Sequence, residues 1–209
     1  DCCNGTFYNN LFVVAINTGL RIGEMAALTW DDIDLKNKVI HVNKTMTYQK
    51  YLDEDCKNFH IEDPKTYTSR RDVPINEICM TALKKQYMQK NIIANREHAK
   101  ESEFQDRLFI TKYNTPINAQ IAIDAINNII KEINTMRDSL DQFEKFSFHT
   151  FRHTFATRCI ESGINPKVVQ EYLGHATLQM TMDLYVHITD DAKHSEIKKL
   201  NNINTKINE

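Results

Sequence analysis

Residues 149–157 read HTFRHTFAT and place His149 three residues before Arg152. Near the start of a helix this spacing puts both side chains on one face. Thr150 is expected to cap a helix that ends at Gly163. An imidazole and a guanidinium that share a helical face can both donate hydrogen bonds to an anion. The stretch therefore predicts a helix that presents an anion-binding pair.

Two further clusters carry residues of the same kind. Residues 18–24, TGLRIGE, place Arg21 at the corner between two predicted helices. Residues 173–175, LGH, end with His175, and Tyr185 follows ten residues later. Each of these residues is common in proteins for structural reasons, so the interpretation depends on their occurring together.

A phosphodiester reaction needs the groups that these clusters supply. Charge on the phosphate oxygens rises during attack, and arginines can hold it bidentately without losing their own charge. A tyrosine hydroxyl can attack phosphorus if a base or a strong field offsets its usual pKa of ~10. A lysine on a turn can protonate the leaving oxygen. The chain offers a complete set: Arg21, Lys65, His149, Arg152, His175 and Tyr185.

Taken in order, these motifs resemble the tyrosine recombinase family, and most of all the integrases of phages and conjugative transposons from low-GC Gram-positive bacteria. The motifs are TGLRIGE, PKT at residues 64–66, SRRDVP at residues 69–74, HTFRHTFAT, and LGH followed by a tyrosine. The similarity extends from about Tyr8 to His187. Any one motif is weak alone, whereas the ordered set is specific.

The resemblance implies a role for each site residue. Arg21 and Arg152 would bind the scissile phosphate, with His149 as a base or phosphate donor. His175 would support the transition state. Tyr185 would be the nucleophile and would form a 3′-phosphotyrosyl link.

The resemblance also implies a general acid and several supporting groups. Lys65 would protonate the 5′ oxygen, although the long segment before it leaves Lys57 as an alternative. Glu24 would support the site by pairing with a basic neighbour. The ester link conserves the bond energy, so neither a metal nor a cofactor is expected. Arg70, Arg71 and His153 are expected to face DNA. The alternative is that they are ordinary surface or core residues.

Whole-chain properties agree with one domain that binds DNA through a local patch. The chain has 209 residues, a formal net charge of −2 and five cysteines. An odd cysteine count without a CxxC spacing indicates neither a disulfide framework nor a zinc site, and favours reduced thiols in the bacterial cytoplasm. The charge excludes a uniformly basic surface but not a basic patch. No stretch is long and apolar enough to predict a membrane span.

The predicted fold class is α+β, mainly helical with a small antiparallel sheet. Helices are expected over 8–18 and 22–28, after Asn76 with Ile92 on the buried side, and after Pro116 with an apolar stripe of Ile117, Ile121, Ala125, Ile129 and Ile133. Strands are expected at 39–42, 45–48, 59–61, 72–75 and 108–110. Three more helices are expected in the last third, and Asn165 and Thr177 are expected to cap two of them. Residues 1–7 are expected to be a linker remnant, 8–190 the catalytic domain, and 191–209 a tail that could exchange with a neighbouring subunit. The N-terminal DNA-binding domains usual in the family are expected to be missing.

The partner is expected to be duplex DNA, bound by a homotetramer that is monomeric without DNA. Two alternatives remain open. Residues 165–185 suit a non-enzymatic helix-turn-helix module, which would leave Arg21 and Lys65 without a purpose. A type IB topoisomerase would share the chemistry but relax supercoils instead of exchanging strands.

Overall fold

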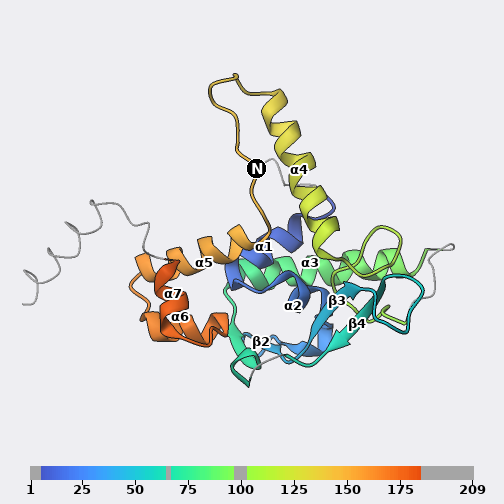
Figure 1. Cartoon of the computed structure of the whole chain (residues 1–209), viewed down its shortest axis with the longest axis horizontal. Coiled ribbons are helices and arrows are strands. Elements are labelled where there is room, and N and C mark those ends of the chain that lie inside the picture. The colour runs from blue at the N-terminus through green and yellow to red at the C-terminus, as the bar shows by residue number, and fades with distance from the viewer. Residues whose placement is uncertain (1–5, 65–66, 97–102, 185–209) are drawn as a thin grey trace, which may run out of the picture.

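The computed structural model describes residues 6–64, 67–96 and 103–184 (Figure 1). The helices are α1 (Asn9–Thr18), α2 (Ile22–Ala27), α3 (Glu77–Ala94), α4 (Ala119–Thr135), α5 (His149–Glu161), α6 (Pro166–Leu173) and α7 (Leu178–Asp183). Short 3₁₀ turns cover Trp30–Asp32 and Tyr67–Ser69. The strands are β1 (Ile33–Asp34), β2 (Val39–Val42), β3 (Thr45–Gln49), β4 (Asn58–Glu62) and β5 (Arg71–Pro74). The prediction of a mainly helical α+β fold is confirmed.

Local sequence sets most helix boundaries. The side chains of Asn76, Asn165 and Thr177 accept hydrogen bonds from the first turns of α3, α6 and α7, as predicted. Gly19 and Gly174 end α1 and α6 in the left-handed conformation, with φ of 63° at each. Both glycines therefore mark sharp turns beside the arginine and histidine motifs.

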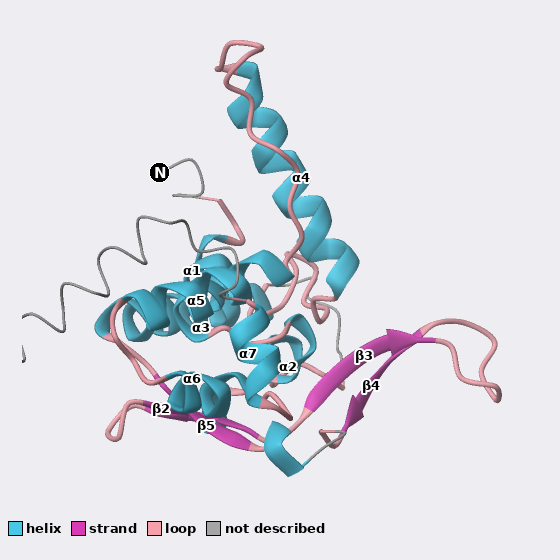
Figure 2. Cartoon of the chain, turned by 60° about the vertical axis from the view of Figure 1, so that its left-hand side comes forward, coloured by secondary structure: helices cyan, strands magenta, loops and turns pink. Residues whose placement is uncertain are grey.

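The strands form two antiparallel sheets. β1, β2 and β5 make a three-stranded sheet in which Ile40 lies opposite Val73. β3 and β4 form a separate hairpin in which Tyr48 lies opposite Phe59, and the rings pack 4.7 Å apart. Figure 2 shows this hairpin reaching away from the helices. The predicted antiparallel strands are thus divided between a sheet in the body and an extended ribbon.

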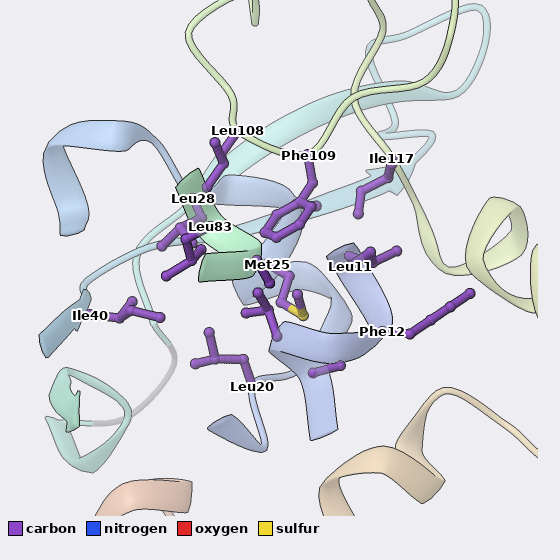
Figure 3. Packing of buried hydrophobic residues seen from close by; sticks show 14 of the residues in the cluster. Leu11, Phe12, Leu20, Met25, Leu28, Ile40, Leu83, Leu108, Phe109 and Ile117 are labelled. Carbon is purple, nitrogen blue, oxygen red and sulfur yellow. The ribbon is translucent and has the colours of Figure 1, made fainter. Parts of the chain in front are cut away.

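The main core lies where α1 and α2 meet α3, the three-stranded sheet and the segment before α4 (Figure 3). α1 packs against both α3 and α5. A smaller apolar cluster joins α5 to α6 through Ala156, Cys159, Val169 and Leu173. This second cluster fixes the helix that carries Arg152 against the helix that precedes His175.

Four details of the sequence prediction are wrong. Residues 108–110 form no regular strand: the stretch is buried, and isolated bridges occur only at Arg107, with Thr29, and at Ile110, with Pro116. On α3, Ile92 is 64% exposed and Ile93 is buried instead. α5 begins at His149, so Thr150 lies inside the helix rather than capping it.

The fourth concerns α4, where the predicted stripe of isoleucines is not the most buried face. Ala122, Ala125, Ile126 and Ile130 are the buried residues. The far end of α4 projects from the body, as Figure 1 shows, so its later apolar positions have fewer neighbours to pack against. Among the described residues, no helix has the length and apolarity that crossing a membrane requires.

Replacing Gly19 by alanine should destabilise the fold more than the same change at Gly163. Both have positive φ, so each alanine costs about 1–2 kcal/mol of left-handed strain. A Cβ at Gly19 would lie 2.6 Å from a Phe155 ring carbon and 2.8 Å from a Leu173 methyl, whereas Gly163 has open space. Overpacking adds about 1–3 kcal/mol at Gly19. Urea unfolding of the two variants measures the difference, and equal losses would contradict this packing.

Candidate active site

Arg21 lies at the corner between α1 and α2, where Glu24 holds it twice. The backbone N–H of Arg21 donates to Glu24 Oε2 at 2.8 Å, and its Nη1 donates to Oε1 at 3.0 Å. The Arg21 side chain remains 38% exposed, whereas Glu24 is buried. Arg21 is therefore fixed at its base while its guanidinium stays accessible to a ligand.

Glu24 stays ionised although it is buried. Burial by itself would raise the pKa of Glu24, but hydrogen bonds and charge from Arg71, and then from Arg21, hold that pKa below its ordinary value. The predicted pairing of Glu24 with a basic neighbour is confirmed, and the carboxylate pairs with two arginines rather than one.

Arg152, on α5, ties together the two turns that flank it. Its Nη1 donates to the carbonyl of Gly19 at 2.8 Å, and its Nη2 donates to the carbonyl of Leu173. The residue is 1% exposed, and its Nε has no hydrogen-bond partner. Burial, together with the charge of Arg21, lowers the pKa of Arg152 to about 9, so the guanidinium remains charged at neutral pH.

The two histidines of the site lie within the field of these arginines. His149 begins α5, and its ring centroid lies 4.7 Å from that of His153. Burial lowers the pKa of His149, and the charges of His153, Arg152 and Arg21 lower it further. His149 is therefore neutral at pH 7 and can accept a proton.

His175 is the more buried imidazole. Its Nδ1 lies 2.9 Å from Thr181 Oγ1. The backbone N–H of His175 donates to the carbonyl of Gln170 at 3.1 Å, and Nε2 of Gln170 donates to the carbonyl of His175 at 3.0 Å. Burial lowers the pKa of His175 to about 4, and the charges of Arg152, Arg21 and Arg71 contribute. The ring is thus a fixed, neutral hydrogen-bonding group.

These interactions bring four of the predicted residues into one region: Arg21, His149, Arg152 and His175. A cavity of about 390 Å³ opens beside them, lined by Arg21, Glu24, Lys44, Thr45, Thr47, Glu62, Pro64, Ser69, Gly174, Ala176 and Met180. With Arg71 included, three arginines face the carboxylates of Glu24 and Glu62, and Lys44 is neutralised by Asp32, so a formal surplus of one positive charge remains. Such a site favours an anion.

Lys65 and Tyr185 lie outside the described residues. Pro64, which precedes Lys65, lines the same cavity as Arg21. The alternative lysine, Lys57, lines a different cavity between the hairpin, α2 and the start of α4. Pro64, the described neighbour of Lys65, is therefore close to the arginines, whereas Lys57 lines another cavity.

The residues expected to face DNA differ in how exposed their side chains are. Arg70 is exposed and pairs with Asp63 at 2.8 Å, and His153 is exposed on α5. Arg71 corrects the expectation of a surface charge, since its side chain is only 6% exposed and its guanidinium is bound by protein groups. The sequence alone could not show which of the two adjacent arginines has the buried side chain.

Sequence reasoning also missed Lys44. Its Nζ lies 2.7 Å from Asp32 Oδ2, and its side chain lines the cavity that Arg21 faces. No motif marks this lysine, because its place depends on how the hairpin packs on α2. Among the described residues, no group of three or more His, Cys, Asp or Glu side chains is placed to hold a metal ion.

The stability of the domain should fall as pH drops from about 6.5 towards 4, in part because of His175. Within this window the unfolded chain binds a proton at His175, whose folded pKa is about 4, and the folded chain does not. This residue adds a slope of at most about 1.4 kcal/mol per pH unit. Denaturant unfolding across this range, compared with His175→Asn, measures that slope; identical slopes for the two proteins would refute the assignment.

Several known proteins are similar to this chain in sequence and in fold. Residues 2–192 match the phage integrase family. The chain is 32% identical to the transposase from transposon Tn916 of Enterococcus faecalis over 192 residues, covering 90% of this chain and 44% of the transposase. It is 30% identical to a XerC-like tyrosine recombinase of Caldanaerobacter subterraneus, covering 92% of this chain and 49% of that protein.

A solved structure of the Tn1549 transposon integrase, residues 82–397, in complex with circular intermediate DNA is also similar. Its TM-score is 0.76 at 28% identity, and the match covers 95% of this chain and 62% of that one. The chain thus spans about half the length of the curated relatives that it matches. By its family match, its relatives and its fold, it belongs to the phage integrase family of tyrosine recombinases.

Proposed function

We propose that this chain is the catalytic domain of a site-specific DNA recombinase that cuts and rejoins strands through Tyr185. The observation that carries the proposal is the shared field of Arg21, Arg152, His149 and His175, which meet from three separate segments. The similarity to an integrase in complex with DNA supports the choice of a DNA phosphate as the anion.

Each group then has a place in the reaction. The guanidiniums of Arg21 and Arg152 bind the non-bridging oxygens of one phosphate and stabilise the charge that builds during attack. The Tyr185 hydroxyl attacks phosphorus, and a neutral His149 takes its proton. The bond to the 5′ oxygen breaks, and Lys65 supplies the proton that this oxygen needs.

The covalent step can also run backwards. The 3′-phosphotyrosyl ester keeps the energy of the cleaved bond, so a free 5′ hydroxyl from a partner duplex can attack it and release Tyr185. Glu24 keeps Arg21 in place, and His175 donates or accepts a hydrogen bond beside the phosphate. Arg70 and His153, whose side chains are exposed, would contact the DNA backbone.

A non-enzymatic DNA-binding module is the second candidate, because α6 and α7 follow one another across a Gly174 turn. Their packing favours the enzyme instead. α6 buries Val169 and Leu173 against α5, and α7 buries Thr181 against His175. The turn between the two helices directs its histidine inward, toward the arginines.

A nicked, end-labelled duplex that carries the recombination site tests the enzymatic function. We expect a protein–DNA adduct that survives SDS and is absent for Tyr185→Phe. Arg21→Lys and Arg152→Lys should each slow its formation roughly 10²–10³-fold, because lysine cannot replace the planar fork. A DNA-retarding protein that never forms the adduct would support the binding module instead.

We further propose that the working form is a homotetramer on two DNA sites, assembled from monomers in the bacterial cytoplasm. The tail, 191–209, which lies outside the described residues, would dock on a neighbouring subunit. Removing residues 195–209 should then impair assembly of paired DNA sites, measured by native gel shift, more than cleavage of a single site. Equal losses of assembly and cleavage would count against docking between subunits.

A further inference from the structure

Arg71 makes an unusual set of contacts for a residue at the start of a strand. It is the first residue of β5, and its side chain is buried, unlike that of its exposed neighbour Arg70. Its guanidinium donates to three different segments: Glu24 on α2, the carbonyl of Tyr172 on α6, and the carbonyl of Ser69 in the preceding turn. A buried arginine with four of its five N–H groups bound to protein acceptors is not a surface charge.

The first of these contacts controls Arg21. Arg71 grips Glu24 with Nη1 on Oε1 and Nη2 on Oε2, both at 2.9 Å. The same two oxygens accept from the side chain and backbone of Arg21. Four donors thus surround one carboxylate, and neither arginine can shift without moving Glu24.

The second contact controls the turn that carries His175. Arg71 Nε donates to the carbonyl of Tyr172 at 2.6 Å, in the last turn of α6, where helix carbonyls lack partners within the helix. A Cβ added at Gly174 would lie 3.1 Å from Arg71 Cδ and 3.2 Å from its Nη1. The arginine therefore packs directly against the glycine that precedes His175.

We propose that Arg71 is a positioning residue, which holds Arg21 and the His175 turn in register so that both meet the same phosphate. The proposal rests on the proposed recombinase function. Four of the five N–H groups of Arg71 are bound by Glu24, Tyr172 and Ser69. Among the described residues, Arg152 has protein partners for only two of its five N–H groups. The proposal therefore assigns phosphate contact to Arg152 and positioning to Arg71. A lysine in its place would keep the charge but could not bind a carboxylate bidentately and a carbonyl at once.

The test compares Arg71→Lys with Arg107→Lys in single-turnover cleavage of the nicked duplex. Arg107 is a matched control, because its side chain is 9% exposed and its Nη1 donates to the carbonyl of Ala27, away from the site. We expect Arg71→Lys to lower the cleavage rate at saturating DNA by roughly 10²-fold, as a displacement of about 1 Å can do. Half-saturating DNA concentration and its salt dependence should stay unchanged, and Arg107→Lys should keep the wild-type rate.

A second measurement needs no DNA. The backbone N–H of Arg21 is bound to Glu24, so its hydrogen exchange, followed by NMR, reports whether that carboxylate is held. Exchange should be faster in Arg71→Lys than in Arg107→Lys. Should Arg71→Lys fail to fold, Glu24→Gln provides the same comparison, with the same expected loss of rate and unchanged DNA binding.

The possible outcomes distinguish a positioning role for Arg71 from a phosphate contact and from a general effect on stability. An unchanged saturated rate with weaker, less salt-sensitive DNA binding would make Arg71 a phosphate contact and overturn the proposal. Equal rate losses in Arg71→Lys and Arg107→Lys would reduce its role to general stability and also overturn it. If the wild-type protein forms no adduct, the recombinase function fails, whereas the exchange of the Arg21 amide still decides whether Arg71 holds that arginine.

Discussion

The guanidinium of Arg152 joins parts of the chain that are distant in sequence, and the site depends on that junction. From α5 it reaches the carbonyl of Gly19 on one side and that of Leu173 on the other. These carbonyls belong to the turns that lead into Arg21 and His175. Both turns have left-handed glycines, so the backbone can present its carbonyls inward at close range. The arrangement of the candidate site therefore depends largely on two main-chain carbonyls that hold the Arg152 side chain.

An excess of positive charge is the main electrostatic feature of the candidate site. The guanidiniums of Arg21, Arg71 and Arg152 lie close enough to repel one another, and Glu24 offsets part of that repulsion. Burial lowers the pKa of both His149 and His175, and the positive charge of the arginines lowers it further. An anion in this region would reduce the repulsion between the arginines and would meet preorganised hydrogen-bond donors, which is the physical basis of the proposed phosphate site.

Much of this arrangement could be predicted from sequence, because local rules fix the motifs. Helix caps at Asn76 and Asn165 and the turns at Gly19 and Gly174 are short-range features, and the two glycine turns lie next to Arg21 and His175. The roles of Arg70 and Arg71 could not be told apart, since which one turns inward depends on packing between β5, α2 and α6. Lys44 was missed for the same reason. The buried face of α4 and the irregular path of residues 108–110 likewise follow from tertiary contacts.

A structure of the Tyr185→Phe protein bound to its duplex target would test the central claim most directly. The account predicts that guanidinium nitrogens of both Arg21 and Arg152 lie within about 3 Å of oxygens on the same phosphate. It also predicts that the phenyl ring at position 185 faces that phosphorus. A complex in which Arg152 still binds only the carbonyls of Gly19 and Leu173, while the phosphate rests on other residues, would contradict it.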